Sequence, residues 1–347
     1  MPIRYDSVLV AALAAELRRC LAGRRLEELH LDPSTRTVRL CLDDGSELAW
    51  LLHPAAGHLL VREGAADPLR SRRGRARGIL DGPRRVTGIE APPDERRLRI
   101  RLGSPSGARS SGEADGPGSL VLELHTNQWN AALLTGERIR AVLWRRSAGT
   151  RSLREGATYG PPGGERLGAE ALPDPETWRR WWHGVEPARR REAALRGVAW
   201  TSATNADWLF GDAEGADPVA ALGRLARLRG SGSRPDEPGR PAAGAPAWLL
   251  ARRWGPQPYP LDLGETGAEP FPSLLAAMSE AASREGLAVP ARSDSAAGGG
   301  RAVLPPGASA EAERLEAALR AVLDRTRPGG SRTGFIGIVA KNVWILG

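Results

Sequence analysis

The segment Thr37–Leu52, which reads TVRLCLDDGSELAWLL, determines the fold expected for the first half of the chain. Its two strand-like runs, Thr37–Leu42 and Glu47–Leu52, flank the sequence Asp43-Asp44-Gly45. Acidic residues followed by glycine between two such runs are typical of a tight turn, because glycine adopts positive φ at no steric cost. We therefore predict a β-hairpin over this segment.

Further strand-like segments follow the hairpin, and two of them, Arg85–Ala91 and Arg96–Leu102, alternate apolar with polar residues. The segments are His58–Arg62, Arg85–Ala91, Arg96–Leu102, Ser119–His125, Asn130–Leu134 and Arg138–Trp144. Before the hairpin, leucines at helical spacing from Leu9 to Leu21 predict an amphipathic helix that Asp6 or Ser7 can cap. We interpret residues 1–160 as a β-rich domain with one helix and a β-sandwich or barrel, so the chain is expected to be an α+β protein.

The middle of the chain favours helices instead of strands. Its helical segments predict a small helical domain over residues 165–230. They are Pro175–His183, Pro187–Arg196, Ala203–Phe210 and Pro218–Arg229. Two strands, Ala247–Arg252 and Gln257–Leu261, and a helix at Pro270–Ala282 predict a small α/β segment over residues 246–285.

The last part of the chain, residues 286–347, has a different character. We expect a flexible linker, a short charged C-terminal helix at Glu311–Asp324 and an atypical tail, Thr333–Gly347. The tail has two interpretations. It is either an apolar strand of a further module or the product of a frameshifted or truncated gene.

The charge of the chain is strongly basic, with a net charge of +8 and an isoelectric point near 10.6. Fixed positive charge favours polyanionic partners, because it releases the counterions condensed on phosphate backbones. However, Lys341 is the only lysine among 49 basic residues, so the arginine content also fits a coding bias. The planar guanidinium of arginine binds two phosphate oxygens at once, which keeps nucleic-acid binding open.

Membrane proteins, disulfide-rich proteins and metalloproteins do not fit the sequence. No stretch approaches the roughly 20 apolar residues that a membrane span needs. Cys20 and Cys41 belong to no C-x-x-C pair, so we expect neither a disulfide framework nor a metal site. The apolar run Ser7–Ala15 is short and continues as an amphipathic helix, so we interpret it as part of the folded protein and not as a signal peptide. We expect a cytoplasmic protein without cofactors or membrane contact.

Four segments occur in an informative order and spacing. They are Met1-Pro2 with Asp6 and the first helix, the strand Ile89–Leu102, the segment Leu122–Leu134 (LELHTNQWNAALL), and the stretch Leu153–Pro162 with Gly156, Tyr159 and Pro161-Pro162. Together they resemble the N-terminal region of the NFACT family, whose members are also described as RqcH or fibronectin-binding protein A-like proteins. Phe271-Pro272-Ser273 with its following helix is similar to a further family element. The resemblance covers roughly residues 1–285, without the family's long coiled coil and C-terminal RNA-binding domain.

The resemblance implies both a fold and a function. The first domain is expected to be similar to formamidopyrimidine-DNA glycosylase, and the helical domain to helix-hairpin-helix modules. The implied function is that of a non-enzymatic RNA-binding factor in ribosome-associated quality control. Its expected partners are the large ribosomal subunit blocked by peptidyl-tRNA and tRNA of the alanine type, which would support C-terminal alanine tailing of the stalled chain. The ribosome itself forms the peptide bond, so no catalytic residue is expected.

Family function also implies candidate tRNA-binding residues, an early aspartate and an Asp-Arg pair. Asp6 matches the first by position, and Glu95-Arg96 matches the pair in an ungapped alignment, with Asp94 one residue away. We expect Arg96 to contact a phosphate or stack on a base, with a neighbouring carboxylate orienting its guanidinium. The structural alternatives are a helix cap for Asp6 and a solvated strand edge for Glu95 and Arg96.

Two further groups of residues are candidates for RNA contacts. The first is a basic run that contains Arg70, Arg72, Arg73, Arg75 and Arg77. We interpret this run either as a clamp for RNA phosphates or as a loop. Trp178, Trp181 and Trp182 lie at helical spacing, which indicates a core rather than a platform for bases.

Two alternative functions remain from the sequence. A DNA-binding or DNA-repair protein of glycosylase-like fold would use Pro2 as its N-terminal nucleophile, but Ile3-Arg4 stands where those enzymes carry acidic residues. A fibronectin-binding surface adhesin is suggested by the older family name. The interpretation of the N-terminus as a mature helix argues against the adhesin.

Overall fold

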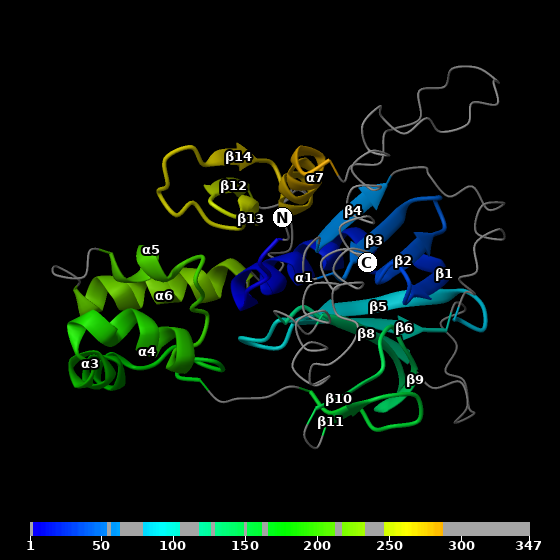
Figure 1. Cartoon of the computed structure of the whole chain (residues 1–347), viewed down its shortest axis with the longest axis horizontal. Helices are drawn as coiled ribbons and strands as arrows, with labels where there is room; N and C mark the ends of the chain where they lie inside the picture. The colour runs from blue at the N-terminus through cyan, green and yellow to red at the C-terminus, as the bar shows by residue number, and fades with distance from the viewer. Residues whose placement is uncertain are drawn as a thin grey trace, which may run out of the picture. The chain divides into compact units, whose positions relative to one another are not determined.

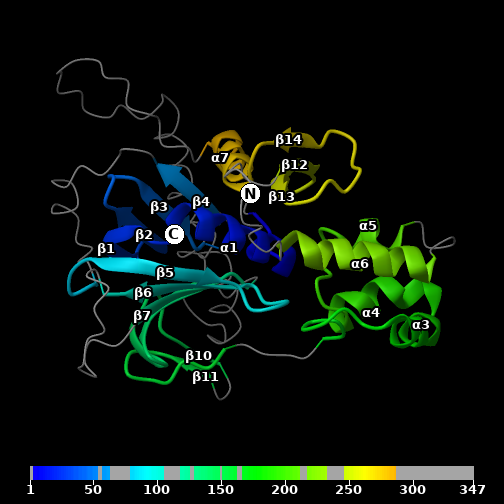
Figure 2. The same cartoon turned by 180° about the vertical axis from the view of Figure 1, so that it is seen from behind.

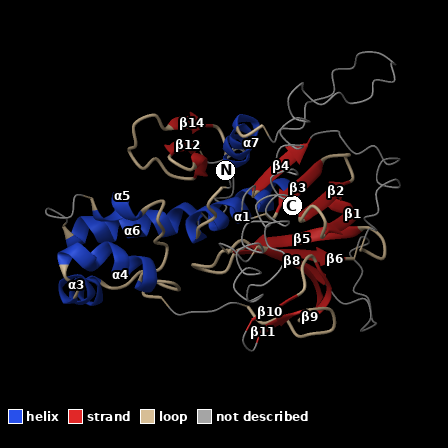
Figure 3. Cartoon of the chain, in the orientation of Figure 1, coloured by secondary structure: helices blue, strands red, loops and turns tan. Residues whose placement is uncertain are grey.

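The computed structural model describes residues 3–53, 57–62, 79–104, 118–125, 129–148, 151–161, 166–211, 217–232 and 246–286. These residues form an α+β fold with one large antiparallel sheet and several helices (Figure 3). All of them belong to one unit of the chain, Met1–Ala288.

The large sheet contains nine strands in the order β4-β3-β2-β1-β5-β6-β7-β8-β9 (Figure 1). The strands are β1 (Arg25–Asp32), β2 (Thr37–Leu42), β3 (Glu47–Leu51), β4 (His58–Arg62), β5 (Arg84–Glu90), β6 (Arg97–Gly103), β7 (Gly118–Glu123), β8 (Asn130–Thr135) and β9 (Arg138–Val142). The predicted hairpin is confirmed, since β2 and β3 pair from Thr37↔Leu51 to Cys41↔Glu47. Except for β1, every strand of this sheet coincides with a segment predicted from the sequence.

The sandwich expected from the sequence is replaced by a single hydrogen-bonded sheet. β1 pairs with β5 through Arg25↔Arg85 and Leu26↔Arg84, and this short ladder joins the two halves of the sheet. The Val86 amide donates to the Arg24 carbonyl oxygen and the Gly23 amide donates to the Val86 carbonyl oxygen, which extends this ladder. The ladder satisfies backbone groups that two separate sheets would leave exposed at their edges.

Strand β1 was missed because its alternation is interrupted. A β-bulge between Leu26 and Glu28 shifts the register against β2 by one residue. Leu26, Leu29 and Leu31 therefore reach the core although their spacing does not follow a period of two. A hydrophobic pattern that changes phase within one strand is not recognised by a simple alternation rule.

Helix α1 (Ser7–Leu21) lies at the centre of the hydrophobic core. The sequence predicts a single leucine stripe, but eleven of its fifteen residues are buried. It packs against β5 and β6 of the sheet and against two helices described below, α6 and α7, as both views of the fold show (Figures 1 and 2). A helix that is apolar on nearly all sides must be enclosed in this way.

The predicted helical region is confirmed between residues 175 and 232. It contains α3 (Pro175–Gly184), the 3-10 turn η2 (Pro187–Arg189), α4 (Arg190–Gly197), α5 (Ala206–Phe210) and α6 (Pro218–Gly232). Trp178 and Trp182 are each 1% exposed, Trp181 packs partly buried against the same core, and the ring centres of Trp182 and Phe210 are 5.7 Å apart. These positions confirm the core role predicted for the three tryptophans. The Trp178 indole donates to the Pro218 carbonyl oxygen at 2.7 Å, so α3 is bound to the start of α6.

The remaining elements are a two-stranded sheet, a three-stranded sheet and a helix. They are β10 (Arg146–Ala148) with β11 (Arg151–Leu153), the small sheet of β12 (Ala247–Arg252), β13 (Gly255–Tyr259) and β14 (Glu269–Phe271), and helix α7 (Leu274–Arg284). The Ser273 hydroxyl caps α7 by accepting from the Ala276 amide at 3.1 Å. The buried Glu16 carboxylate of α1 accepts from the amides of Leu274 at 2.9 Å and Leu275 at 3.0 Å, which binds the start of α7 to α1.

Several sequence predictions lie outside the described residues. They are Pro2, the basic run Arg70–Arg77, the helix at residues 311–324 and the tail Thr333–Gly347. Over the part of the chain that is described, no helix combines the length and apolar character needed to cross a bilayer.

Replacing Glu16 with glutamine is expected to lower the free energy of unfolding by about 1–2 kcal/mol. One of the two carboxylate oxygens that accept from the start of α7 becomes an NH2 group, which faces an amide donor in a buried position. Urea unfolding measures the change. The matched control is Glu280→Gln on the partly exposed side of α7, for which a loss below about 0.5 kcal/mol is expected. Equal losses in both variants would contradict the role of Glu16.

Candidate functional site

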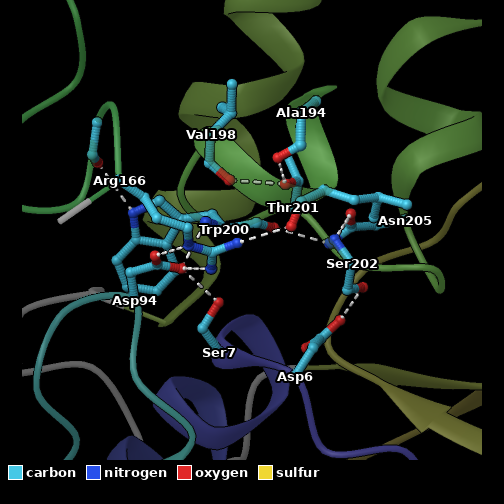
Figure 4. Close-up of polar contacts among 12 residues, drawn as sticks. Asp6, Ser7, Asp94, Arg166, Ala194, Val198, Trp200, Thr201, Ser202 and Asn205 are labelled. Atoms are coloured by element: carbon cyan, nitrogen blue, oxygen red, sulfur yellow. Dashed lines mark hydrogen bonds and ion pairs between the residues drawn. The ribbon is translucent and has the colours of Figure 1, made fainter. Parts of the chain in front are cut away.

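The N-terminus of α1 carries a carboxylate that joins three distant parts of the chain. Asp6 caps the helix, because its Oδ1 accepts a hydrogen bond from the Leu9 amide at 2.8 Å. Its Oδ2 accepts from the Ser202 hydroxyl at 2.6 Å (Figure 4) and from the Tyr259 hydroxyl at 3.1 Å. The helix-cap interpretation of Asp6 is confirmed, and the same side chain also holds the loop before α5 and strand β13.

Asp6 lies in a desolvated environment and is only 5% exposed. Burial raises the pKa of its carboxyl, while its hydrogen bonds and the positive charge of Arg96 act in the opposite direction. Burial and the nearby Asp6 charge also raise the pKa of Tyr259, whose hydroxyl accepts from Asn205 Nδ2 at 2.8 Å. Tyr259 is therefore a neutral donor to Asp6 at physiological pH.

The neighbouring residue, Ser7, connects α1 to the turn before β6. Its hydroxyl donates to Asp94 Oδ1 at 2.9 Å, and the same oxygen accepts from the Trp200 amide at 2.7 Å (Figure 4). Arg166 binds Asp94 through Nε and Nη2, with Nε at 2.6 Å from Oδ2. Asp94 has φ of +56°, a left-handed conformation that aspartate tolerates better than most residues. The turn thus directs the Asp94 carboxylate toward Ser7, Trp200 and Arg166. We call the contacts of Asp6 and Asp94 around the start of α1 the Asp6 junction.

The pair expected at Glu95 and Arg96 stays a prediction. Glu95 forms an ion pair with Arg97 at 2.8 Å. Arg96 lies close enough to Asp6 for its charge to lower the pKa of that carboxyl. The strand-edge alternative is wrong, because β6 is an interior strand and Glu95 and Arg96 are both partly buried just before it.

Two of the segments that resemble the family meet beside Arg96. Glu123, only 2% exposed, binds Arg151 through both carboxylate oxygens and accepts from the Tyr159 hydroxyl at 2.7 Å. Burial, with Arg96 as the next cause, lowers the pKa of His125 to about 4. His125 is therefore neutral at physiological pH, and its ring neighbours a positively charged region.

A second cationic group precedes Asp6 in the chain, at Arg4. The Arg4 guanidinium stacks 3.8 Å above the centre of the Trp254 ring. The Arg4 backbone amide donates to Gln257 Oε1 at 2.9 Å, and the Arg4 carbonyl oxygen accepts from Gln257 Nε2 at 3.3 Å. Arg4 and the adjacent Arg253 are exposed, and neither forms an ion pair within the described residues. We call Arg4, Arg253 and Trp254 the Arg4 platform.

The carboxylates around the start of α1 are engaged within the protein. The carboxylates of the Asp6 junction, Asp6 and Asp94, are each occupied by three or more donors, so neither is available as a base or nucleophile. Planar guanidinium and aromatic groups lie at the sides of this junction, which suits phosphates and bases. Sequence reasoning located Asp6 and Arg96 but missed Ser202, Tyr259 and Arg166, because no local pattern marks residues that meet only in the folded chain.

Comparisons with known proteins identify the fold. No family model matches the sequence, and no curated protein matches it. Among solved structures, the fibrinogen binding protein from Staphylococcus aureus is similar with a TM-score of 0.56 and 13% identity, over 80% of this chain and 98% of that one. The N-terminal part of the fibronectin/fibrinogen-binding protein from Streptococcus suis gives a TM-score of 0.55 and 15% identity, over 80% and 98% of the two chains. This chain has the fold of those N-terminal domains.

The raised pKa of Asp6 predicts a pH dependence of stability. The folded protein holds more protons than the unfolded chain between about pH 3.9 and the folded-state pKa of Asp6. This contribution is complete below the unfolded pKa and is lost as pH rises through the folded pKa. We expect the free energy of unfolding of the wild type, minus that of Asp6→Asn, to decrease with rising pH by about 1.4 kcal/mol per unit of pKa shift.

Urea unfolding of both proteins from about pH 4 to about pH 8 measures this difference. Asp217→Asn, at the exposed start of α6, is the matched helix-cap control. A difference that stays constant or increases with pH would be inconsistent with a raised pKa of Asp6.

Proposed function

We propose that this protein binds tRNA and the large ribosomal subunit as a member of the NFACT family, without catalysing a reaction itself. The carrying observation is the position of Arg96, which lies beside the α1 cap in a fold shared with fibronectin/fibrinogen-binding protein N-terminal domains. In the proposed function, it assists C-terminal alanine tailing on subunits blocked by peptidyl-tRNA. The segments that resemble the family include Asp6 and Arg96, which supports this assignment.

Electrostatics favour an anionic partner at this junction. Buried Asp6 and Asp94 are occupied within the protein, while Arg96 is partly exposed and the Arg4 platform carries two more guanidinium groups. Cations near a phosphate backbone contribute to affinity by counterion release, and guanidinium planes also stack on unpaired bases. tRNA offers both phosphates and single-stranded ends. The junction therefore suits tRNA better than a neutral small molecule.

A second candidate function is binding to fibronectin or fibrinogen. It is favoured by the names of the similar structures, which describe a fibrinogen binding protein and a fibronectin/fibrinogen-binding protein. A basic surface can also bind acidic segments of such proteins. The two functions are distinguished by their partners, because only the first requires ribosomal subunits and tRNA.

For the first function, Arg96→Ala is expected to weaken tRNA binding about tenfold with the fold intact, because a charge-assisted contact is lost. Filter binding at a fixed salt concentration measures the affinity, and circular dichroism checks the fold. The control is Arg101→Ala on β6, the strand that follows Arg96; the exposed Arg101 side chain pairs with Glu90 at 3.8 Å. Equal loss in both variants would indicate unspecific charge attraction, and unchanged affinity in Arg96→Ala would refute the assignment.

Sedimentation distinguishes the two candidate functions. If the proposed function is correct, the full chain co-migrates with large ribosomal subunits in a sucrose gradient and does so more strongly when the subunits carry peptidyl-tRNA. The same preparation is applied to immobilised fibronectin and fibrinogen at about 0.15 M salt, where weak charge attraction is screened. Saturable binding to either of these proteins without subunit binding would favour the second function.

A further inference from the structure

A cluster of potential metal ligands lies on the face of the sheet opposite the main core. Glu28, Cys41 and Glu47 occupy directly paired positions across β1, β2 and β3. Paired residues in antiparallel strands project to the same face, and His30 shares this face because it follows Glu28 by two positions. The cluster shares no residue with the Asp6 junction.

The distances in this cluster suit a single divalent ion. One ligand atom from each of Glu28, His30 and Cys41 lies within 4.8 Å of the other two, and Glu28 Oε2 is 2.8 Å from His30 Nε2. Around tetrahedral zinc, bond lengths of about 2.0–2.3 Å place neighbouring ligand atoms about 3.3–3.6 Å apart. The observed separations bracket this range, so small side-chain rotations would complete the geometry.

The β-bulge in β1 is what creates the cluster. If β1 had no bulge, the regular register that starts at Leu26↔Leu42 would place Glu27 opposite Cys41, and Glu28 would face the core. Bulges often redirect a side chain at a functional position. The chain has only two cysteines and five histidines, so the meeting of one of each beside a redirected glutamate is unusual for chance placement.

The charge around Cys41 favours a cation. Cys41 lies between two carboxylate side chains, because it pairs with Glu28 on β1 and with Glu47 on β3. A divalent ion would compensate the carboxylates and bind the thiolate, with the thiol proton released to solvent. His30 is 3% exposed, whereas the Glu28 side chain is 44% exposed. The cluster is thus open to solvent on the Glu28 side.

We propose that Glu28, His30 and Cys41 bind one Zn²⁺ ion, with a fourth position occupied by water. These are the nitrogen, sulfur and oxygen donors that zinc prefers, and three protein ligands leave one position for solvent. The sequence indicated no metal site because its ligands come from two strands and form no short spacing motif. This site does not depend on the proposed function at the Asp6 junction.

Cobalt(II) is the spectroscopic probe for this site in the full reduced chain. We expect one Co²⁺ per chain, intense visible bands typical of tetrahedral coordination, a thiolate-to-cobalt charge-transfer band, and displacement of both by Zn²⁺. Cys41→Ser is expected to abolish the charge-transfer band. The matched control is Cys20→Ser, which removes the other cysteine, exposed on α1, and is expected to leave spectrum and affinity unchanged.

Two further variants test the other ligands without relying on cysteine chemistry. Glu28→Gln and His30→Asn are each expected to weaken Zn²⁺ affinity at least about tenfold in competition with a chromophoric chelator. Circular dichroism checks each fold, and Glu28→Gln remains decisive if the buried His30 variant unfolds, because Glu28 is partly exposed. Weak octahedral cobalt bands without a charge-transfer band, or equal effects in Cys20→Ser and Cys41→Ser, would overturn the proposal.

Discussion

The burial of helix α1 is the constraint on which the other parts of this structure depend. Eleven of the fifteen residues of α1 are buried, so the sheet, α6 and α7 must together cover most of its surface. The helix also brings two carboxylates, Asp6 and Glu16, into this interior. A buried charge costs several kcal/mol unless donors satisfy it, so the hydrogen bonds from Ser202, Tyr259 and the start of α7 are conditions for the fold.

The sequence predicted the elements better than their connections. The strands from the hairpin to β9 and the helices between residues 175 and 232 follow local alternation and helical spacing, which depend only on neighbouring residues. Strand β1 was missed because its bulge changes the phase of the pattern. The single sheet was missed because the short β1–β5 ladder depends on two distant segments that carry no mutual signal.

The candidate site was predicted in the same uneven way. Asp6 was placed correctly as a cap because capping is local, but its bonds to Ser202 and Tyr259 cross about 200 residues or more. Glu95 was assigned to Arg96 by adjacency, yet residues two apart share a face in extended backbone, so it meets Arg97. The carboxylate that reaches Ser7 and Arg166 belongs to Asp94, one position before the residue aligned with the family's aspartate.

The long separations around α1 also have a consequence for biosynthesis. Because translation proceeds from the N-terminus, α1 emerges before its polar partners, which lie 196, 253 and 258 residues later in the chain. β5 and β6 follow α1 soon and can cover part of it, whereas α6 and α7 can cover the rest only after residues 218–284 have been made. Contacts over such long separations form slowly, because the entropy of loop closure opposes them. Asp6 and Glu16 therefore receive their donors late in the folding of the chain.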